Sequence, residues 1–155
     1  MFTNKDVVLD PTTTSTSQMA PDGAFMWYTH PTYGQQLYRQ VQNKDASAAT
    51  VVGCAYSFSA NDVNSVDLAG AADEKIKVAG IAQTIIATDS WGWLLCRGMG
   101  QVKSQADYSA GEFLGVVGAD GKLDNVAASH ISAIAKAFTA AGGVNVVGTA
   151  IINIF

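Results

Sequence analysis

The sequence has little charge for its length. Of its 155 residues, 14% are charged and 48% are hydrophobic, whereas a typical soluble domain has about 25% charged residues. Nine Lys and Arg residues against thirteen Asp and Glu residues give a net charge of −4, and no basic run occurs. A nucleic-acid binder that neutralises phosphates needs a basic face. We therefore expect no nucleic acid as a partner, and the low charge suggests that other protein covers part of the surface.

Cysteine and long apolar runs are also scarce. The spacing of Cys54 and Cys96 matches no zinc or redox motif, which favours two small buried side chains. No stretch approaches the ~20 apolar residues that span a bilayer, and residues 7–9 form too short an apolar run for a secretory signal. We expect a protein made in a cytoplasm, with no membrane partner.

Motifs for catalysis or metal binding are missing. His30 and His130 are the only histidines, and neither belongs to an HExxH pair. No serine lies in a Gly-x-Ser-x-Gly turn. We therefore expect no catalytic residues, no cofactor and no metal site. The alternative, an enzyme with an unrecognised site, requires one of these histidines to meet a carboxylate in space.

Residues 1–24 differ from the rest of the chain. A run of Thr and Ser follows Pro11, and a Pro-Asp-Gly turn lies at 21–23, with no helical period. We interpret residues 1–24 as an N-terminal arm that either moves freely or orders against a neighbouring subunit. Residues 25–155 form a single β-rich domain in this interpretation.

A short apolar motif with one glycine recurs in this domain. It occurs at residues 51–55, 78–82 and 146–150, with a weaker echo at 114–116. Each copy indicates a buried strand in which glycine permits a bulge or a close neighbouring backbone. Alternation predicts a further strand at 36–41. The apolar segments at 81–87 and 91–98 predict the two strands of a hairpin, and the second strand continues over 101–103. A strand is also expected from residue 110, before a turn at 119–122.

One amphipathic helix is expected near the C-terminus. Asp124 or Asn125 can cap it, the apolar residues from Ala127 to Phe138 recur at helical spacing, and Gly142 and Gly143 can end it. The fold class is therefore mainly β, a small barrel or sandwich with one amphipathic helix and an extended N-terminal arm.

Aromatic and terminal apolar residues are the candidate contact residues. Trp91 and Trp93 would face one side of a strand, as core, as a subunit interface or as a ligand site. The chain ends in Ile154 and Phe155, although termini normally fray. The candidate interface residues are Phe2, Pro11, Thr13, Phe25, Trp27, Tyr28, Trp91, Trp93, Ile154 and Phe155.

The order of strands and turns resembles that of small structural proteins of tailed bacteriophage virions, especially capsid decoration (cement) proteins. The resemblance covers roughly residues 34–155. It is carried by the segments 34–43 and 52–56, by Val78–Gln83 followed by Trp91-Gly92-Trp93, by the turn 120–124, and by the closing Val-Gly-x-Ala strand.

This resemblance implies a β-tulip-like domain, often trimeric, that sits on the outer surface of the capsid and stabilises contacts between subunits of the major capsid protein. The expected partners are the major capsid protein and two further copies in a homotrimer. The expected location is the virion, after synthesis in the host cytoplasm. Alternatives are a head-fibre or tail-associated virion protein, or a carbohydrate- or receptor-binding β module that exposes Trp27, Tyr28, Trp91 or Trp93.

Overall fold

The computed structural model describes residues 10–21, 23–46, 48–59, 62–70, 77–118, 120–127 and 133–155. These residues are mainly β. The strands, in chain order, are β1 (Phe25–His30), β2 (Gly34–Asn43), β3 (Ala55–Ser59), β4 (Asp62–Leu68), β5 (Val78–Ala82), β6 (Trp91–Lys103), β7 (Phe113–Val116), β8 (Leu123–Val126), β9 (Ala133–Ala137) and β10 (Val147–Asn153).

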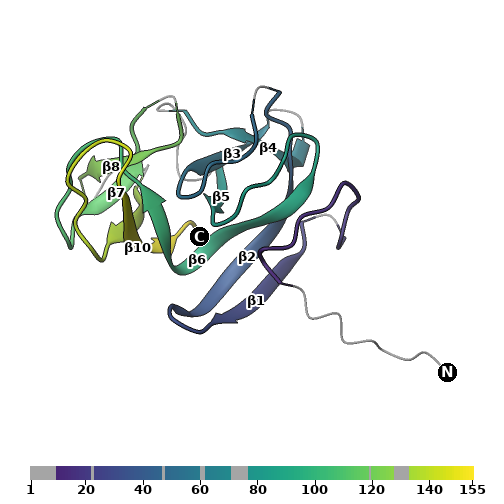
Figure 1. Ribbon diagram of the computed structural model, residues 1–155, viewed down its shortest axis with the longest axis horizontal. Coiled ribbons are helices and arrows are strands. Elements are labelled where there is room, and N and C mark those ends of the chain that lie inside the picture. Colours follow the sequence, from purple (N-terminus) through teal and green to yellow (C-terminus); the bar gives the residue numbers. More distant parts are fainter. Residues whose placement is uncertain are drawn as a thin grey trace.

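All ten strands belong to one sheet, in the order β1-β2-β4-β3-β5-β6-β10-β9-β7-β8. An additional pairing of β2 with β6 closes β2, β4, β3, β5 and β6 into a circuit. Figure 1 shows β6 running through the middle of the molecule between the group of β3, β4 and β5 and the group of β7, β8 and β10. The predicted β content is confirmed, but one branched sheet replaces the simple barrel or sandwich.

The strand β6 organises both groups because it is buried on both faces. Trp93 and Leu95 belong to the larger core cluster, and Leu94 belongs to the second. Alternate side chains of a strand point to opposite faces, so β6 separates the two clusters. This arrangement explains why its sequence is a continuous apolar run rather than an alternating one.

The recurring glycine motif marks close backbone contacts. The strands expected at 78–82 and 146–150 are present as β5 and β10, whereas the first copy forms a turn that leads into β3 at Ala55. A β-carbon at Gly53 would lie 2.7 Å from the Lys103 amide nitrogen, and one at Gly80 would lie 2.5 Å from the Leu94 β-carbon. Glycine is therefore required by the packing at these positions.

The expected hairpin is present in part. Ile81 pairs with Leu95 and Ala82 with Leu94 in antiparallel register. However, β5 ends at Ala82, so the segment 83–87, expected as its continuation, belongs to the connection.

The expected amphipathic helix is wrong for the part of its range that the structure describes. Residues 123–126 form β8 and residues 133–137 form β9; His130 and Ile131 lie outside the described residues. In β9, Ala135 and Ala137 are buried while Lys136 is exposed, and the strand pairs with both β7 and β10. Short apolar runs fit either periodicity, and the two neighbouring strands decide this one.

An extended arm over residues 1–24 is not confirmed. Residues 1–9, including Phe2, lie outside the described residues. From residue 10 the chain lies on its own domain, where Ser15 and Trp91 exchange backbone hydrogen bonds of 3.0 and 2.7 Å. Met19 and Ala20 pack against the larger core cluster. This part of the segment therefore contacts the sheet of the same chain.

Candidate functional site

The two faces of β1 carry two different surfaces. Phe25 and Trp27 project outward and are 48% and 60% exposed, whereas Met26 between them is buried. Tyr28 and His30 continue the opposite face and are half-buried. Because β1 forms a hairpin with β2 at the edge of the sheet, one strand supplies side chains to both surfaces.

The outward face of β1 continues onto the end of β10. Phe155 is 60% exposed, and its ring meets that of Phe25 edge to face with centroids 5.5 Å apart. Trp27 and Ile151, which is 48% exposed, line an open groove of about 450 Å³. We call Phe25, Trp27, Ile151 and Phe155 the aromatic surface.

Two arginines border the aromatic surface. The Arg39 guanidinium lies 5.4 Å from the Phe25 ring centroid and 4.5 Å from that of Phe58, and Nη2 donates to the Val63 carbonyl oxygen at 3.3 Å. Burial lowers the pKa of Arg39. Arg97 lines the groove beside Trp27. The surface thus combines exposed aromatic rings with cations, the combination enriched in protein interfaces.

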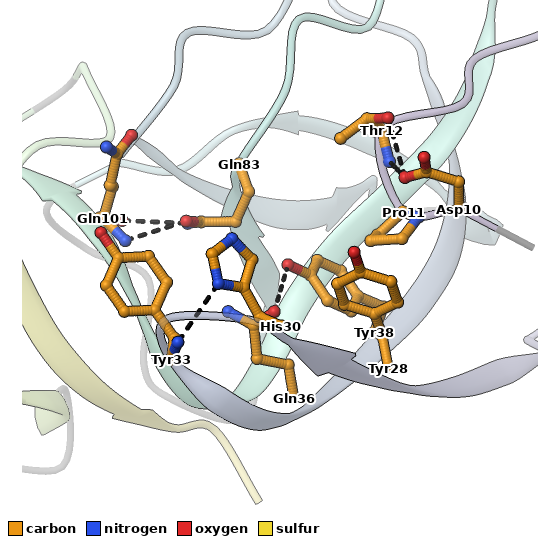
Figure 2. A pocket seen from close by; sticks show the side chains of 10 residues that line it. All are labelled: Asp10, Pro11, Thr12, Tyr28, His30, Tyr33, Gln36, Tyr38, Gln83 and Gln101. Carbon is orange, nitrogen blue, oxygen red and sulfur yellow. Dashed lines mark hydrogen bonds between the residues drawn. The ribbon is translucent and has the colours of Figure 1, made fainter.

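The inward face of β1 opens into a separate pocket of about 310 Å³ (Figure 2). Aromatic rings from β1, β2 and the turn between them form one part of its wall: Tyr28, His30, Tyr33 and Tyr38. Side-chain amides form another part: Gln36, Gln83 and Gln101. The segment Asp10, Pro11 and Thr12 completes the lining.

The rings in the pocket hold one another in fixed orientations. His30 stacks on Tyr33 with centroids 4.6 Å apart and planes 20° apart, and Tyr28 lies edge to face with both His30 and Tyr38. His30 Nδ1 accepts hydrogen bonds from the amides of Thr32 and Tyr33 at 3.0 and 3.2 Å. These bonds assign the proton of neutral His30 to Nε2.

Polar groups of the pocket are also fixed by hydrogen bonds. Tyr38 donates to Gln36 Oε1 at 3.1 Å, and Gln36 Nε2 donates to the Met99 carbonyl oxygen at 2.6 Å. Gln83 exchanges hydrogen bonds of 2.8 and 2.9 Å with the backbone of Gln101. Both networks hold side chains in place before any ligand arrives.

Asp10 supplies the carboxylate of the pocket. Its Oδ1 accepts hydrogen bonds from the Thr12 amide and hydroxyl, both at 2.8 Å, and these bonds lower the pKa of Asp10. Burial, and secondarily the nearby Tyr28 and Asp10, raise the pKa of Tyr38. At neutral pH the pocket therefore presents an ionised Asp10 and a neutral Tyr38 hydroxyl.

The structure separates the sequence-derived interface candidates into several environments. Phe25, Trp27 and Phe155 come together on the aromatic surface, while Pro11 and Tyr28 line the pocket. Thr13 is exposed, Trp91 is half-buried beside Ser15, Ile154 is 6% exposed, and Trp93 is fully buried in the core.

Sequence reasoning missed the residues that complete these sites. Ile151 and Arg97 belong to the groove, and Gln83 and Gln101 belong to the pocket. Strand alternation offered a signal for Ile151, since it is the outward residue between two buried ones. Nothing in the sequence indicates that Gln83 and Gln101 meet, because they are 18 positions apart and no motif connects them.

The described residues contain no candidate metal site and no candidate membrane helix. Within the described residues, no group of three or more His, Cys, Asp or Glu side chains is placed to hold a metal ion. The same part of the chain has no helix whose length and apolar character would let it cross a bilayer.

Comparison with known proteins finds a likeness to a solved structure. No family model matches the chain, and no curated protein matches it. The fold is similar to the crystal structure of the head fiber gp8.5 N base in bacteriophage phi29, with a TM-score of 0.55 and 15% sequence identity. The match covers 77% of this chain and 95% of that one. At this identity the likeness shows a shared fold.

Proposed function

We propose that this chain is a non-enzymatic structural protein of a tailed-phage virion that binds the outer surface of the capsid. The observation that carries the proposal is the fold likeness, which spans almost all of a head-fibre base. It supports the same class of protein as the resemblance of the strand order to capsid decoration proteins. Fold alone does not define function; attachment to a capsid also requires a suitable surface.

The aromatic surface is suited to attachment. Trp27 and Phe155 are each 60% exposed, which leaves large rings in water beside Phe25. Burying such rings against a partner removes apolar area from water. This burial favours binding by about 25 cal/mol for each Å² of apolar area. Arg39 and Arg97 at its border favour a partner with acidic side chains around an apolar centre. In the proposal this partner is the major capsid protein.

Stabilisation of the shell follows from the position that the proposal assigns to the protein. A small domain that bridges neighbouring capsid subunits adds contacts that must break before the subunits separate. Because a shell repeats the same site many times, copies joined in a homotrimer gain affinity through avidity. The homotrimer is part of the proposal.

A head-fibre role is the second candidate, and the head-fibre likeness favours it directly. In that role the domain would be the base that holds a fibre on the head. Both candidates use the same contact with the shell. They differ in the number of copies bound and in whether a longer chain projects outward.

Binding to isolated heads tests the proposal. Purified protein is mixed with heads of the phage that encodes it, lacking this protein, and bound chains are counted after sedimentation. We expect saturable binding that the double substitution Trp27→Ala and Phe155→Ala weakens at least about tenfold, a hot-spot-sized loss. Phe138→Ala, which removes a ring that is 58% exposed just after β9 and does not belong to the aromatic surface, is the matched control.

The outcomes separate the candidates. Saturation at many copies per head supports capsid decoration, and saturation at few sites supports a fibre base. Absence of binding by the folded wild-type protein contradicts both. Equal losses for the control and the double variant would show that the aromatic surface is not the site of attachment.

A further inference from the structure

We propose that the pocket between residues 10–12 and the β1–β2 hairpin binds an uncharged saccharide. This inference goes beyond attachment to the shell, because the pocket lies on the opposite face of β1 from the aromatic surface. The neighbours Trp27 and Tyr28 separate the two: Trp27 lines the groove and Tyr28 lines the pocket. One strand can thus serve two partners at once.

The size of the pocket fits one or two sugar rings. Its volume of about 310 Å³ lies at the lower end of the range for small-ligand sites, roughly 300–1,000 Å³. Figure 2 shows side chains from the N-terminal segment and from the hairpin around a common space, with Gln83 and its hydrogen bonds to Gln101 at one side. A site of this size suits a short stretch of a polysaccharide.

The charge of the lining selects against anions. Asp10 is ionised at neutral pH, because the Thr12 bonds lower its pKa. No Lys or Arg side chain is among the described residues that line the pocket. A phosphate or carboxylate ligand would therefore meet a negative charge without a compensating cation, whereas a hydroxyl group can donate to Asp10.

The remaining lining has the two chemistries that a sugar needs. The half-buried rings of Tyr28 and Tyr33 offer apolar surface to the C–H face of a pyranose. The His30 Nε2–H is a donor, because Nδ1 accepts the Thr32 and Tyr33 amides. The Gln101 backbone holds Gln83 in place, while the Gln101 side-chain amide makes no hydrogen bond within the described part of the chain. That amide can both donate to and accept from a sugar hydroxyl.

Preorganisation supports binding by a pocket of this kind. The ring stack and the Gln36–Tyr38 and Gln83–Gln101 networks are formed without a ligand, so little side-chain entropy remains to be lost on binding. An uncharged polysaccharide that repeats the recognised unit could then engage several copies of the protein together.

Nuclear magnetic resonance titration of the full-length protein tests the proposal. Maltotriose and tri-N-acetylchitotriose are the neutral probes, and glucose 6-phosphate is the anionic probe. We expect at least one neutral probe to shift the amide signals of Thr12, Tyr33 and Gln101 with a dissociation constant of about 1 mM, an affinity ordinary for few contacts. Glucose 6-phosphate should bind more weakly than the neutral probe.

Variants assign the binding to the pocket. Gln101→Ala and Asp10→Asn should each weaken binding of the neutral probe about fivefold, the effect of losing one hydrogen bond. Trp27→Ala should leave it unchanged, since Trp27 lies on the other face. Because the two variants change different groups of the pocket, a local rearrangement caused by one substitution would not explain the loss in both.

Several results would overturn the inference. These are no shift with either neutral probe at tens of millimolar, shifts confined to residues outside the pocket, tighter binding of glucose 6-phosphate, or full affinity in both pocket variants. Each can occur while heads still bind the protein. Conversely, loss of head binding in the Trp27→Ala and Phe155→Ala protein with intact sugar binding would leave this inference standing, so the two proposals fail separately.

Discussion

The ring of Phe155 stands edge-on to the ring of Phe25, with centroids 5.5 Å apart and planes at 67°. This contact joins the segment after β10 to the first residue of β1, although the two strands are not neighbours in the sheet. It places residues from both ends of the domain on one exposed surface. The final residues therefore divide their roles, with Ile154 buried in the core and Phe155 exposed beside Phe25.

This division predicts different effects of two neighbouring substitutions. Ile154→Ala should lower the free energy of unfolding by about 2–4 kcal/mol, because it leaves a cavity in the larger core cluster. Phe155→Ala should lower it by only about 1 kcal/mol, the scale of one exposed aromatic pair. Urea denaturation measures both. Equal losses would contradict the assignment of Ile154 to the core and Phe155 to the surface.

Gly80→Ala should destabilise the domain by about 1–3 kcal/mol, the usual cost of overpacking. The added methyl group would lie 2.5 Å from the Leu94 β-carbon and 3.1 Å from the Leu95 carbonyl oxygen. Gly142→Ala is the control, since a β-carbon there meets nothing within 4 Å. Thermal melts of the two variants compare them directly, and an unchanged melting temperature for Gly80→Ala would refute the close contact between β5 and β6.

The N-terminal segment makes a testable contact with β6. Ser15→Pro removes the amide that donates to the Trp91 carbonyl oxygen at 3.0 Å, which should cost about 1 kcal/mol of stability. Thr16→Pro, at an exposed neighbour, is the matched control because proline there favours the extended conformation of Ser15. If chemical denaturation finds both variants as stable as the wild type, residues 10–21 do not dock as described.

Alkaline pH should unfold the protein through its buried acids. Burial raises the pKa of Cys96 from 9.0 to about 12 and that of Tyr56 from 10.0 to about 12. Well below pH 9, both groups are neutral in the folded and unfolded states. Between pH 9 and 12 the unfolded state loses these protons first, so stability falls as pH rises.

Cys96→Ala separates the thiol from the other groups in this pH dependence. The variant should lose less stability than the wild type between pH 9 and 11, even if the substitution itself lowers stability at pH 7. Denaturation curves at each pH give the slope. An identical slope in both proteins would contradict the burial of a protonated Cys96 thiol.

The strands were more predictable than their arrangement. Alternation in β2 and the apolar runs of β5, β6 and β10 identified these elements, because burial on one or both faces leaves a clear pattern. The predicted helix was wrong because residues 133–137 fit both periods locally. The pairing with β7 and β10 fixes the conformation of that segment, and such long-range pairing is absent from a single stretch of sequence.

The candidate sites were predictable only in part. Phe25, Trp27 and Phe155 were identified as apolar residues that needed a partner, but their meeting on one surface depends on the sheet topology. The environments of Trp91 and Trp93 were not predictable, because the same sequence pattern fits a buried ring and an exposed one. The pocket combines Asp10, the β1–β2 hairpin, Gln83 and Gln101, which no motif connects.

The most direct test of the central claim is to locate the protein on virions. A phage that encodes an epitope-tagged copy of this chain is purified, labelled with gold-conjugated antibody and examined by electron microscopy. The proposal predicts gold on the outer surface of intact heads, reduced by Trp27→Ala combined with Phe155→Ala. Purified virions that carry no label and contain no tagged chain by immunoblot would contradict a structural role in the virion.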